Sequence, residues 1–313
     1  MEKIREQIKE FKPNLSPSSL NLYLSKLKKF NNDKGKFNIR SLYNYDKVME
    51  VVDRRENLST RKSTLTAIVV ALQAQKRPNK KLIEKYREVM INYLTKENSD
   101  AMKQEKSDKQ EKNWISMDDF TGLINKLQNK IKEKGIIKND TITDGEYKLL
   151  QDYVILRLYH EYPFRNDFGS LHIVNNEDGL EKDKNYLVTG NDYKIILNKY
   201  KTSKKYGTKE YVLSKQLKNL VRKLLKHNTT GMLLANRSRT KPMTRNNLTI
   251  TLQTIFMKHL GKKIGSSMLR HIQSTADNKN KETLLEQQKE EQKTQDRYLH
   301  SGKTNQLYAK LND

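Results

Sequence analysis

The sequence predicts a mainly α-helical protein with a small antiparallel β-sheet, a fold of the α+β class. Apolar residues recur every three or four positions through the first hundred residues and through most of the second half, as on the buried face of a helix. Short runs rich in β-branched and aromatic residues gather between 171 and 213. A charged segment, 97–112, separates the two halves, so the 313 residues predict two domains.

Residues 14–96 predict a small helical domain, preceded by an N-terminal tail at 1–13. Ser16 followed by Pro17 is typical of a helix start, because Ser caps free backbone N–H groups and Pro has none to leave unpaired. Four helices follow from the apolar spacing of Leu20, Tyr23, Leu24, Leu27 and Phe30, of Leu42, Tyr45, Val48 and Val52, of Leu65, Ile68, Val69 and Leu72 after a Ser59 cap, and of Leu82, Tyr86, Val89, Met90 and Tyr93 after Pro78. They suffice for a bundle.

Residues 97–112 alternate in charge and lack large aliphatic side chains, so they predict a solvated linker. The second domain, 113–313, opens with a helix whose Ser116 and Asp119 have capping-box spacing. The remaining elements are helices at 144–161, 217–224, 248–260, 268–272 and 282–297, a short final piece around Leu307, and strands at 171–174, 186–189, 193–197 and 211–213, with Gly190-Asn191 as a two-residue hairpin turn.

The charge balance points to a polyanionic partner. The 62 Lys and Arg outnumber the 37 Asp and Glu, which gives a formal net charge of +25, and nucleic acid is the first candidate for such a chain. The absence of cysteine excludes disulfides and thiolate chemistry, and the six His show no metal-ligand spacing, so neither a metal nor a cofactor is expected.

No membrane association or secretion is expected. The longest apolar run, 65–72, is far shorter than the roughly 20 residues of a membrane span. The N-terminus shows no signal-peptide pattern, so the protein is expected inside a cell.

Four segments of the second half place polar or cationic residues where they interrupt packing patterns. Arg165 lies just past Pro163, beside Asp167, an acid able to orient it; taken alone, such a pair at a helix end is more often structural. Segment 199–209 holds five lysines, which suits phosphate contact but is also compatible with a solvated basic turn. The other two segments are 267–272, where Ser267, Arg270 and His271 share one helix face suited to an anion, and 298–308, with His300 and Tyr308.

The order of these segments resembles that of the tyrosine recombinases, or phage-type integrases, over nearly the whole chain. The segment 15–23, Leu-Ser-Pro-Ser-Ser-Leu-Asn-Leu-Tyr, is similar to the opening helix of their helical core-binding domain, and 113–313 to their catalytic domain. The resemblance assigns catalytic roles to Arg165, Lys201, Arg270, His300 and Tyr308, and phosphate contacts to Ser267 and His271.

The resemblance implies site-specific cleavage and rejoining of double-stranded DNA without metal or ATP. Tyr308 would attack a phosphodiester to form a 3′-phosphotyrosyl link, while Lys201 would protonate the departing 5′-oxygen. Partners would be DNA and, in the synaptic complex, three further copies in a homotetramer; the location would be intracellular, with DNA. The Lys- and Asn-rich composition is compatible with a virus or mobile element.

Departures from the family pattern leave alternatives open. Ser267 stands where the family usually has His or Lys, Asp167 follows Arg165 by two residues instead of three, and the eight-residue gap from His300 to Tyr308 is short. Tyr298 is therefore an alternative nucleophile, and Lys204 is an alternative to Lys201. A type IB topoisomerase and a non-catalytic DNA-binding protein remain rival functions.

Overall fold

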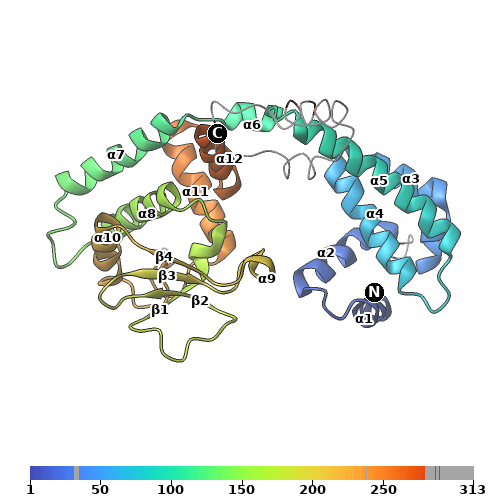
Figure 1. The fold of residues 1–313 in the computed structure, drawn as a ribbon, viewed down its shortest axis with the longest axis horizontal. Coiled ribbons are helices and arrows are strands. Elements are labelled where there is room, and N and C mark those ends of the chain that lie inside the picture. Colours follow the sequence, from blue (N-terminus) through green and yellow to red (C-terminus); the bar gives the residue numbers. More distant parts are fainter. Residues whose placement is uncertain (32–34, 237, 279–285, 287–288, 290–313) are drawn as a thin grey trace, which may run out of the picture. The chain divides into compact units, whose positions relative to one another are not determined.

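The computed structural model describes residues 1–31, 35–236, 238–278, 286 and 289. Contacts separate two compact units, one that includes Met1–Glu105 and one that spans Lys106–Lys281 (Figure 1). Each unit has its own apolar core. Within the described residues, no helix is long and apolar enough to cross a membrane. The fold is mainly α-helical with one small sheet, as the sequence predicts.

The first unit consists of helices around a buried central helix, α4. Its elements are α1 (Glu2–Phe11), α2 (Pro17–Leu27), the 3₁₀ turns Lys28–Phe30 and Ile39–Tyr43, α3 (Tyr45–Asp53), α4 (Leu58–Gln73) and α5 (Lys80–Met102). Helix α4 is buried on most of its surface and packs against α1, α2, α3 and α5. The side chain of Asn57 caps it by accepting a hydrogen bond from Thr60 N at 3.1 Å, so the expected Ser59 cap is wrong.

The expected N-terminal tail, 1–13, is instead part of this unit. Ile4 and Ile8 lie one turn apart on α1, are buried, and belong to the same apolar core as α2 and α4. Two apolar side chains at i and i+4 are enough to attach a short helix when a core is available to receive them.

The expected linker, 97–112, is largely helical. Helix α5 continues through Met102 and α6 covers Asp108–Asn113. The charges that suggested a solvated linker are compatible with an exposed helix, because they pair along it: Lys103 lies 3.4 Å from Asp100. The end of α6 belongs to the second unit, since Asn113 Oδ1 accepts a hydrogen bond from the backbone N–H of Lys263 at 2.7 Å.

The second unit surrounds α8, a helix that is buried along most of its length. After α6, its helical elements are α7 (Met117–Glu133), α8 (Asp144–Glu161), the 3₁₀ turn η3 (Asn166–Ser170), α9 (Ser203–Tyr206), α10 (Lys215–Leu225), α11 (Arg245–Leu260) and α12 (Ser266–Asp277). Helix α7 begins with the predicted Ser116–Asp119 capping box. The predicted helix 282–297 lies almost entirely outside the described residues, and the piece around Leu307 lies wholly outside them.

The sheet has four strands, β1 (Leu171–Val174), β2 (Asn185–Val188), β3 (Lys194–Leu197) and β4 (Lys209–Val212), in the order β1-β2-β3-β4. Only the last two pairings are antiparallel. Strands β1 and β2 are parallel, with Leu171 opposite Asn185, because residues 175–184 carry the chain back to the start of β1. The predicted all-antiparallel sheet is therefore wrong, and the β2–β3 hairpin has residues 189–193 between its strands instead of a two-residue turn.

Candidate functional site

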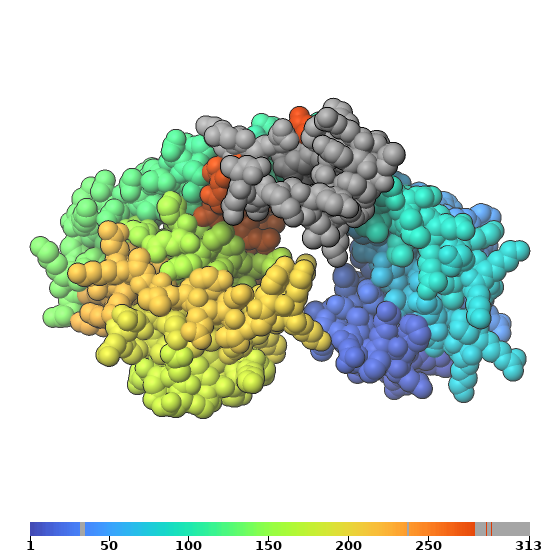
Figure 2. Space-filling view, in the orientation of Figure 1, coloured from blue at the N-terminus to red at the C-terminus, as the bar shows by residue number. Residues whose placement is uncertain are grey.

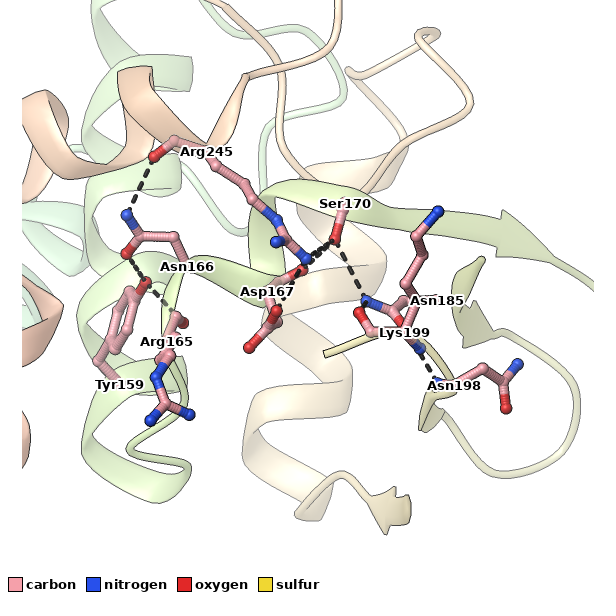
Figure 3. A network of polar contacts seen from close by, with 9 residues as sticks. All are labelled: Tyr159, Arg165, Asn166, Asp167, Ser170, Asn185, Asn198, Lys199 and Arg245. Atoms are coloured by element: carbon pink, nitrogen blue, oxygen red, sulfur yellow. Dashed lines mark hydrogen bonds and ion pairs between the residues drawn. The ribbon is translucent and has the colours of Figure 1, made fainter. Parts of the chain in front are cut away.

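Arg165 is held by its backbone, and its side chain is exposed. Helix α8 ends at Glu161, and the single hydroxyl proton of Tyr159 in its last turn is shared between Arg165 O at 3.3 Å and Asn166 Oδ1 at 3.0 Å. The neighbouring Phe164 ring stacks on Phe168 with centroids 5.1 Å apart. In Figure 3 no dashed line joins the Arg165 guanidinium to the other residues drawn, and because Arg165 is exposed a ligand can reach it.

Helix α12 brings Arg270 close to Arg165. The amide of Gln273, one turn beyond Arg270, donates to Tyr159 O and to His160 O, both at 3.0 Å, and so ties α12 to the last turn of α8. Partial burial and then the charge of Arg165 lower the pKa of Arg270, whereas Asp167 acts in the opposite direction. An arginine stays charged at neutral pH despite such a decrease, so two like charges act on each other here.

Asp167 is the buried acid of this region, and its partner is Arg245. Arg245 Nη2 lies 2.8 Å from Asp167 Oδ1, and the Asp167 side chain is only 8% exposed. The expectation that Asp167 orients Arg165 is therefore incomplete: η3, which carries Asp167, packs against α11, where Arg245 begins the helix. Gly169 lies in this contact, where a Cβ would be 3.4 Å from the backbone of Arg245.

The electrostatics of the region favour an anion. Burial raises the pKa of Asp167, and the nearby charges of Arg245, Arg165 and Arg270 oppose that increase. The charges of three guanidiniums thus act on one carboxylate, so positive charge exceeds negative by two when Asp167 is ionised. Such a group of guanidinium donors suits a phosphate better than solvent alone.

A depression of about 360 Å³ adjoins this group on the surface of α12. Arg270, Ser267 and His271 line it together, as expected from their helical spacing, and Pro163, two residues before Arg165, also lines it. Asp277 also lines the depression and adds one negative charge at its far end on the helix. The combination offers a guanidinium, a hydroxyl and an imidazole to one bound group.

Lys201 lies on an exposed connection between β3 and β4, which includes α9 and which we call the lysine loop (residues 199–208). In Figure 2 this yellow segment lies on the surface of the second unit. The alternative, Lys204, lies in α9. His300, Tyr308 and the rival Tyr298 lie outside the described residues. Of the seven assigned residues, the structure places Arg165, Arg270, Ser267 and His271 in one region, and Lys201 on the lysine loop.

Sequence reasoning missed Arg245, Asn166, Gln273 and Asn185. One signal was available for Arg245: it follows the capping residue Thr244 and so places a positive charge in the first turn of a helix, where the helix dipole disfavours it. A violated local rule often marks a functional position. The three amides carried no such signal, because their partners are distant in sequence.

The first unit carries a separate basic cluster formed by Lys26, Lys29 and Arg55. Burial and then the charges of Arg55 and Lys26 lower the pKa of Lys29, so the positive charges of the two neighbours act on Lys29. Neighbouring basic side chains differ, because each has an acidic partner: Arg54 pairs with Glu50, Arg61 with Asp53, and Lys62 with Glu97. Among the residues that the structure describes, no acid forms an ion pair with Lys26, Lys29 or Arg55, so these cations are available to a polyanion.

Comparison with known proteins adds no family assignment. No family model matches the chain, and no curated protein matches its sequence.

Proposed function

We propose that this chain is a DNA strand transferase of the tyrosine-recombinase type, which cleaves and rejoins DNA at specific sites through a 3′-phosphotyrosyl intermediate. The observation that carries the proposal is the convergence of Arg165 and Arg270, which are 105 positions apart in sequence, beside the buried Asp167. These are the two arginines that the resemblance assigns to the scissile phosphate.

The geometry supports an electrostatic role for both arginines. Their guanidiniums would hold the non-bridging oxygens of one phosphate and stabilise the charge that accumulates in the five-coordinate transition state. Ser267 and His271 would add contacts from the same helix as Arg270. The surrounding positive charge would favour the phenolate of Tyr308, whose ordinary pKa of about 10 makes it a weak nucleophile at neutral pH. His300 would donate a further hydrogen bond to the phosphate.

DNA binding is supported by charge in both units. The net charge of +25 suits a polyanion, and the cluster of Lys26, Lys29 and Arg55 offers a phosphate contact on the helical unit. A chain that contacts DNA through both units would grip the duplex at more than one place. Strand exchange between two sites would then require a tetramer of this chain.

Two rival functions make different predictions. A type IB topoisomerase would use the same residues but relax supercoiled DNA without exchanging strands between defined sites. A non-catalytic DNA-binding protein would bind DNA in a salt-sensitive way and form no covalent adduct. The second rival draws some support from Ser267, which stands where a proton-transferring His or Lys is usual in the family.

A nicked DNA substrate that traps the covalent intermediate tests the proposal. We expect a protein–DNA adduct on a denaturing gel for the wild type and none for Tyr308→Phe. Arg270→Ala should slow adduct formation by about 10²- to 10³-fold, because it removes one electrostatic contact to the transition state. If Tyr308→Phe forms the adduct and Tyr298→Phe does not, Tyr298 is the nucleophile. If the wild type forms no adduct, the proposed enzymatic function is refuted.

The matched control is Arg239→Ala. Arg239 pairs with Asp144 at the first turn of α8, whereas Arg165 follows the last turn of the same helix. Eighteen helical residues span about 27 Å, so Arg239 lies remote from the proposed site. Its loss removes the same charge from the protein and should leave the cleavage rate within about twofold of the wild type.

A further inference from the structure

We propose that Asn185 is a positioning residue that fixes the start of the lysine loop, so that Lys201 meets the oxygen that leaves the scissile phosphate. This inference rests on the proposed function. Asn185 is the first residue of β2 and is 2% exposed, although its side chain is a polar amide. Burying an amide destabilises the folded protein unless the amide forms its hydrogen bonds.

The side chain of Asn185 makes four hydrogen bonds, and three of them hold the backbone where the lysine loop begins. Its Oδ1 accepts from Asn198 N at 2.9 Å and from Lys199 N at 2.7 Å, and its Nδ2 donates to Lys199 O at 3.0 Å. The fourth goes from Nδ2 to Ser170 Oγ at 3.3 Å. The two donors and the two acceptor positions of the amide are all used.

These bonds extend the sheet beyond its last backbone pair. Asn185 is paired with Leu197, where β3 ends, and the side chain then binds the next two residues along the chain. The chain therefore leaves the sheet at Lys199 in a fixed direction, two residues before Lys201. An exposed loop anchored at its root keeps fewer conformations, so less entropy is lost when Lys201 engages a substrate.

The same network reaches the arginine group. Ser170 Oγ, which accepts from Asn185, also accepts from Arg245 Nη2 at 3.3 Å and donates to Asp167 O at 2.9 Å (Figure 3). The root of the lysine loop and the buried acid are thus joined through one serine hydroxyl. Because the network sets the spacing between them, it aligns the proton donor with the phosphate-binding group.

In the proposed cleavage step Tyr308 Oη attacks phosphorus and its phenolic proton passes to solvent. The bond between phosphorus and the 5′-oxygen breaks, and the Lys201 ammonium gives its proton to that oxygen, which leaves as a hydroxyl. Lys201 is then reprotonated from solvent. General-acid catalysis of this kind contributes about 10²- to 10⁴-fold and depends on the position of the acid.

Replacing the 5′-bridging oxygen of the scissile phosphate by sulfur separates positioning of the acid from other effects, because a thiolate leaves without a proton. On the oxygen substrate we expect cleavage to be about 100-fold slower in Lys201→Ala and about tenfold slower in Asn185→Ala. On the sulfur substrate both variants should approach the wild-type rate. Arg270→Ala should remain slow on both, because it acts on the phosphate oxygens.

A matched control accounts for the loss of a buried amide as such. Asn228 is also buried and also holds a loop by donating from Nδ2 to backbone carbonyls, at 2.8 Å to Met232 O and 3.1 Å to Leu233 O. Asn228→Ala should change the cleavage rates of the oxygen and sulfur substrates by the same factor. Asn185→Asp keeps the hydrogen-bond acceptors and loses the donors. Its cleavage rate on the oxygen substrate should lie between those of wild type and Asn185→Ala, and it replaces the alanine variant in the test if that variant does not fold.

The outcomes separate this inference from the function on which it rests. If the wild type forms the adduct and Asn185→Ala is equally slow on both substrates, or as fast as the wild type on oxygen, the positioning role is wrong while the enzyme stands. If the wild type cleaves neither substrate, the proposed function fails and the positioning role with it. Faster amide hydrogen exchange at Asn198 and Lys199 in Asn185→Ala is expected, and unchanged exchange would refute the anchoring.

Discussion

Replacing Arg245 by Ala tests whether Asp167 is a charged, buried centre that needs its arginine. Removing one partner of a fully buried ion pair costs about 3–5 kcal/mol. The cost should be lower here, because the Arg245 side chain is 52% exposed and Arg165 and Arg270 remain nearby. We expect a loss of about 2 kcal/mol at pH 7, which corresponds to a fall in Tm of about 4–8 °C for a unit of this size.

The loss should depend on pH in a definite direction. Burial raises the pKa of Asp167 in the folded state, so the stability that this group contributes is complete below its ordinary value near 4 and falls as pH rises through the folded pKa. Without Arg245 the pKa of Asp167 in the folded state rises further, so more of the free energy of unfolding is lost as pH rises from 4 toward that pKa. The deficit of Arg245→Ala relative to wild type should therefore grow from pH 4 to pH 7.

The chain supplies its own probe for this measurement. Its single tryptophan, Trp114, lies in the second unit and packs against the core of that unit, so its fluorescence follows unfolding there. Urea titrations of wild type and Arg245→Ala at several pH values give the deficit. In an Asp167→Asn background the same replacement should cost less and show no pH trend. A deficit that is constant between pH 4 and pH 7 would refute the account of Asp167 as an ionised centre.

Other contacts give further predictions. Lys29→Ala should lower the slope of log DNA affinity against log salt concentration by about one. Arg54→Ala removes a cation that Glu50 already neutralises and should leave the slope unchanged. Equal slopes for wild type and Lys29→Ala would exclude Lys29 as a phosphate contact. Tyr86→Phe should cost about 1–2 kcal/mol in urea unfolding followed by circular dichroism, because it leaves the buried Leu42 carbonyl without its 2.9 Å hydrogen bond. Ser116→Ala removes a helix cap and should cost about 1 kcal/mol by tryptophan fluorescence.

Elements that depend on local signals were predictable from the sequence. The helix predicted at 144–161 has those bounds in the structure, because its apolar spacing is regular and Thr143 caps its first turn. The strand predicted at 171–174 is also found as predicted. The parallel pairing of β1 with β2 was not predictable in the same way, because it depends on how the intervening chain returns to the sheet.

In the candidate site, too, contacts that depend on local spacing were predictable and contacts between distant segments were not. Helical spacing placed Ser267, Arg270 and His271 on one face, and all three line one depression. Asp167 was assigned to Arg165 because the two are neighbours in sequence, yet its ion pair is formed with Arg245, 78 positions away. A contact of that length requires the packing of η3 on α11, which no periodicity in the sequence encodes.

The arrangement around Asp167 is unfavourable for folding alone, and this is an argument for a ligand. Arg165 and Arg270 repel each other, and Arg245 occupies a helix start where the dipole disfavours a cation. Asp167 carries at most one negative charge against the three positive charges of Arg165, Arg245 and Arg270, so it neutralises the group only in part. A bound phosphate would supply the missing negative charge and relieve all three conflicts together, and a polyanion such as DNA presents that group at regular spacing.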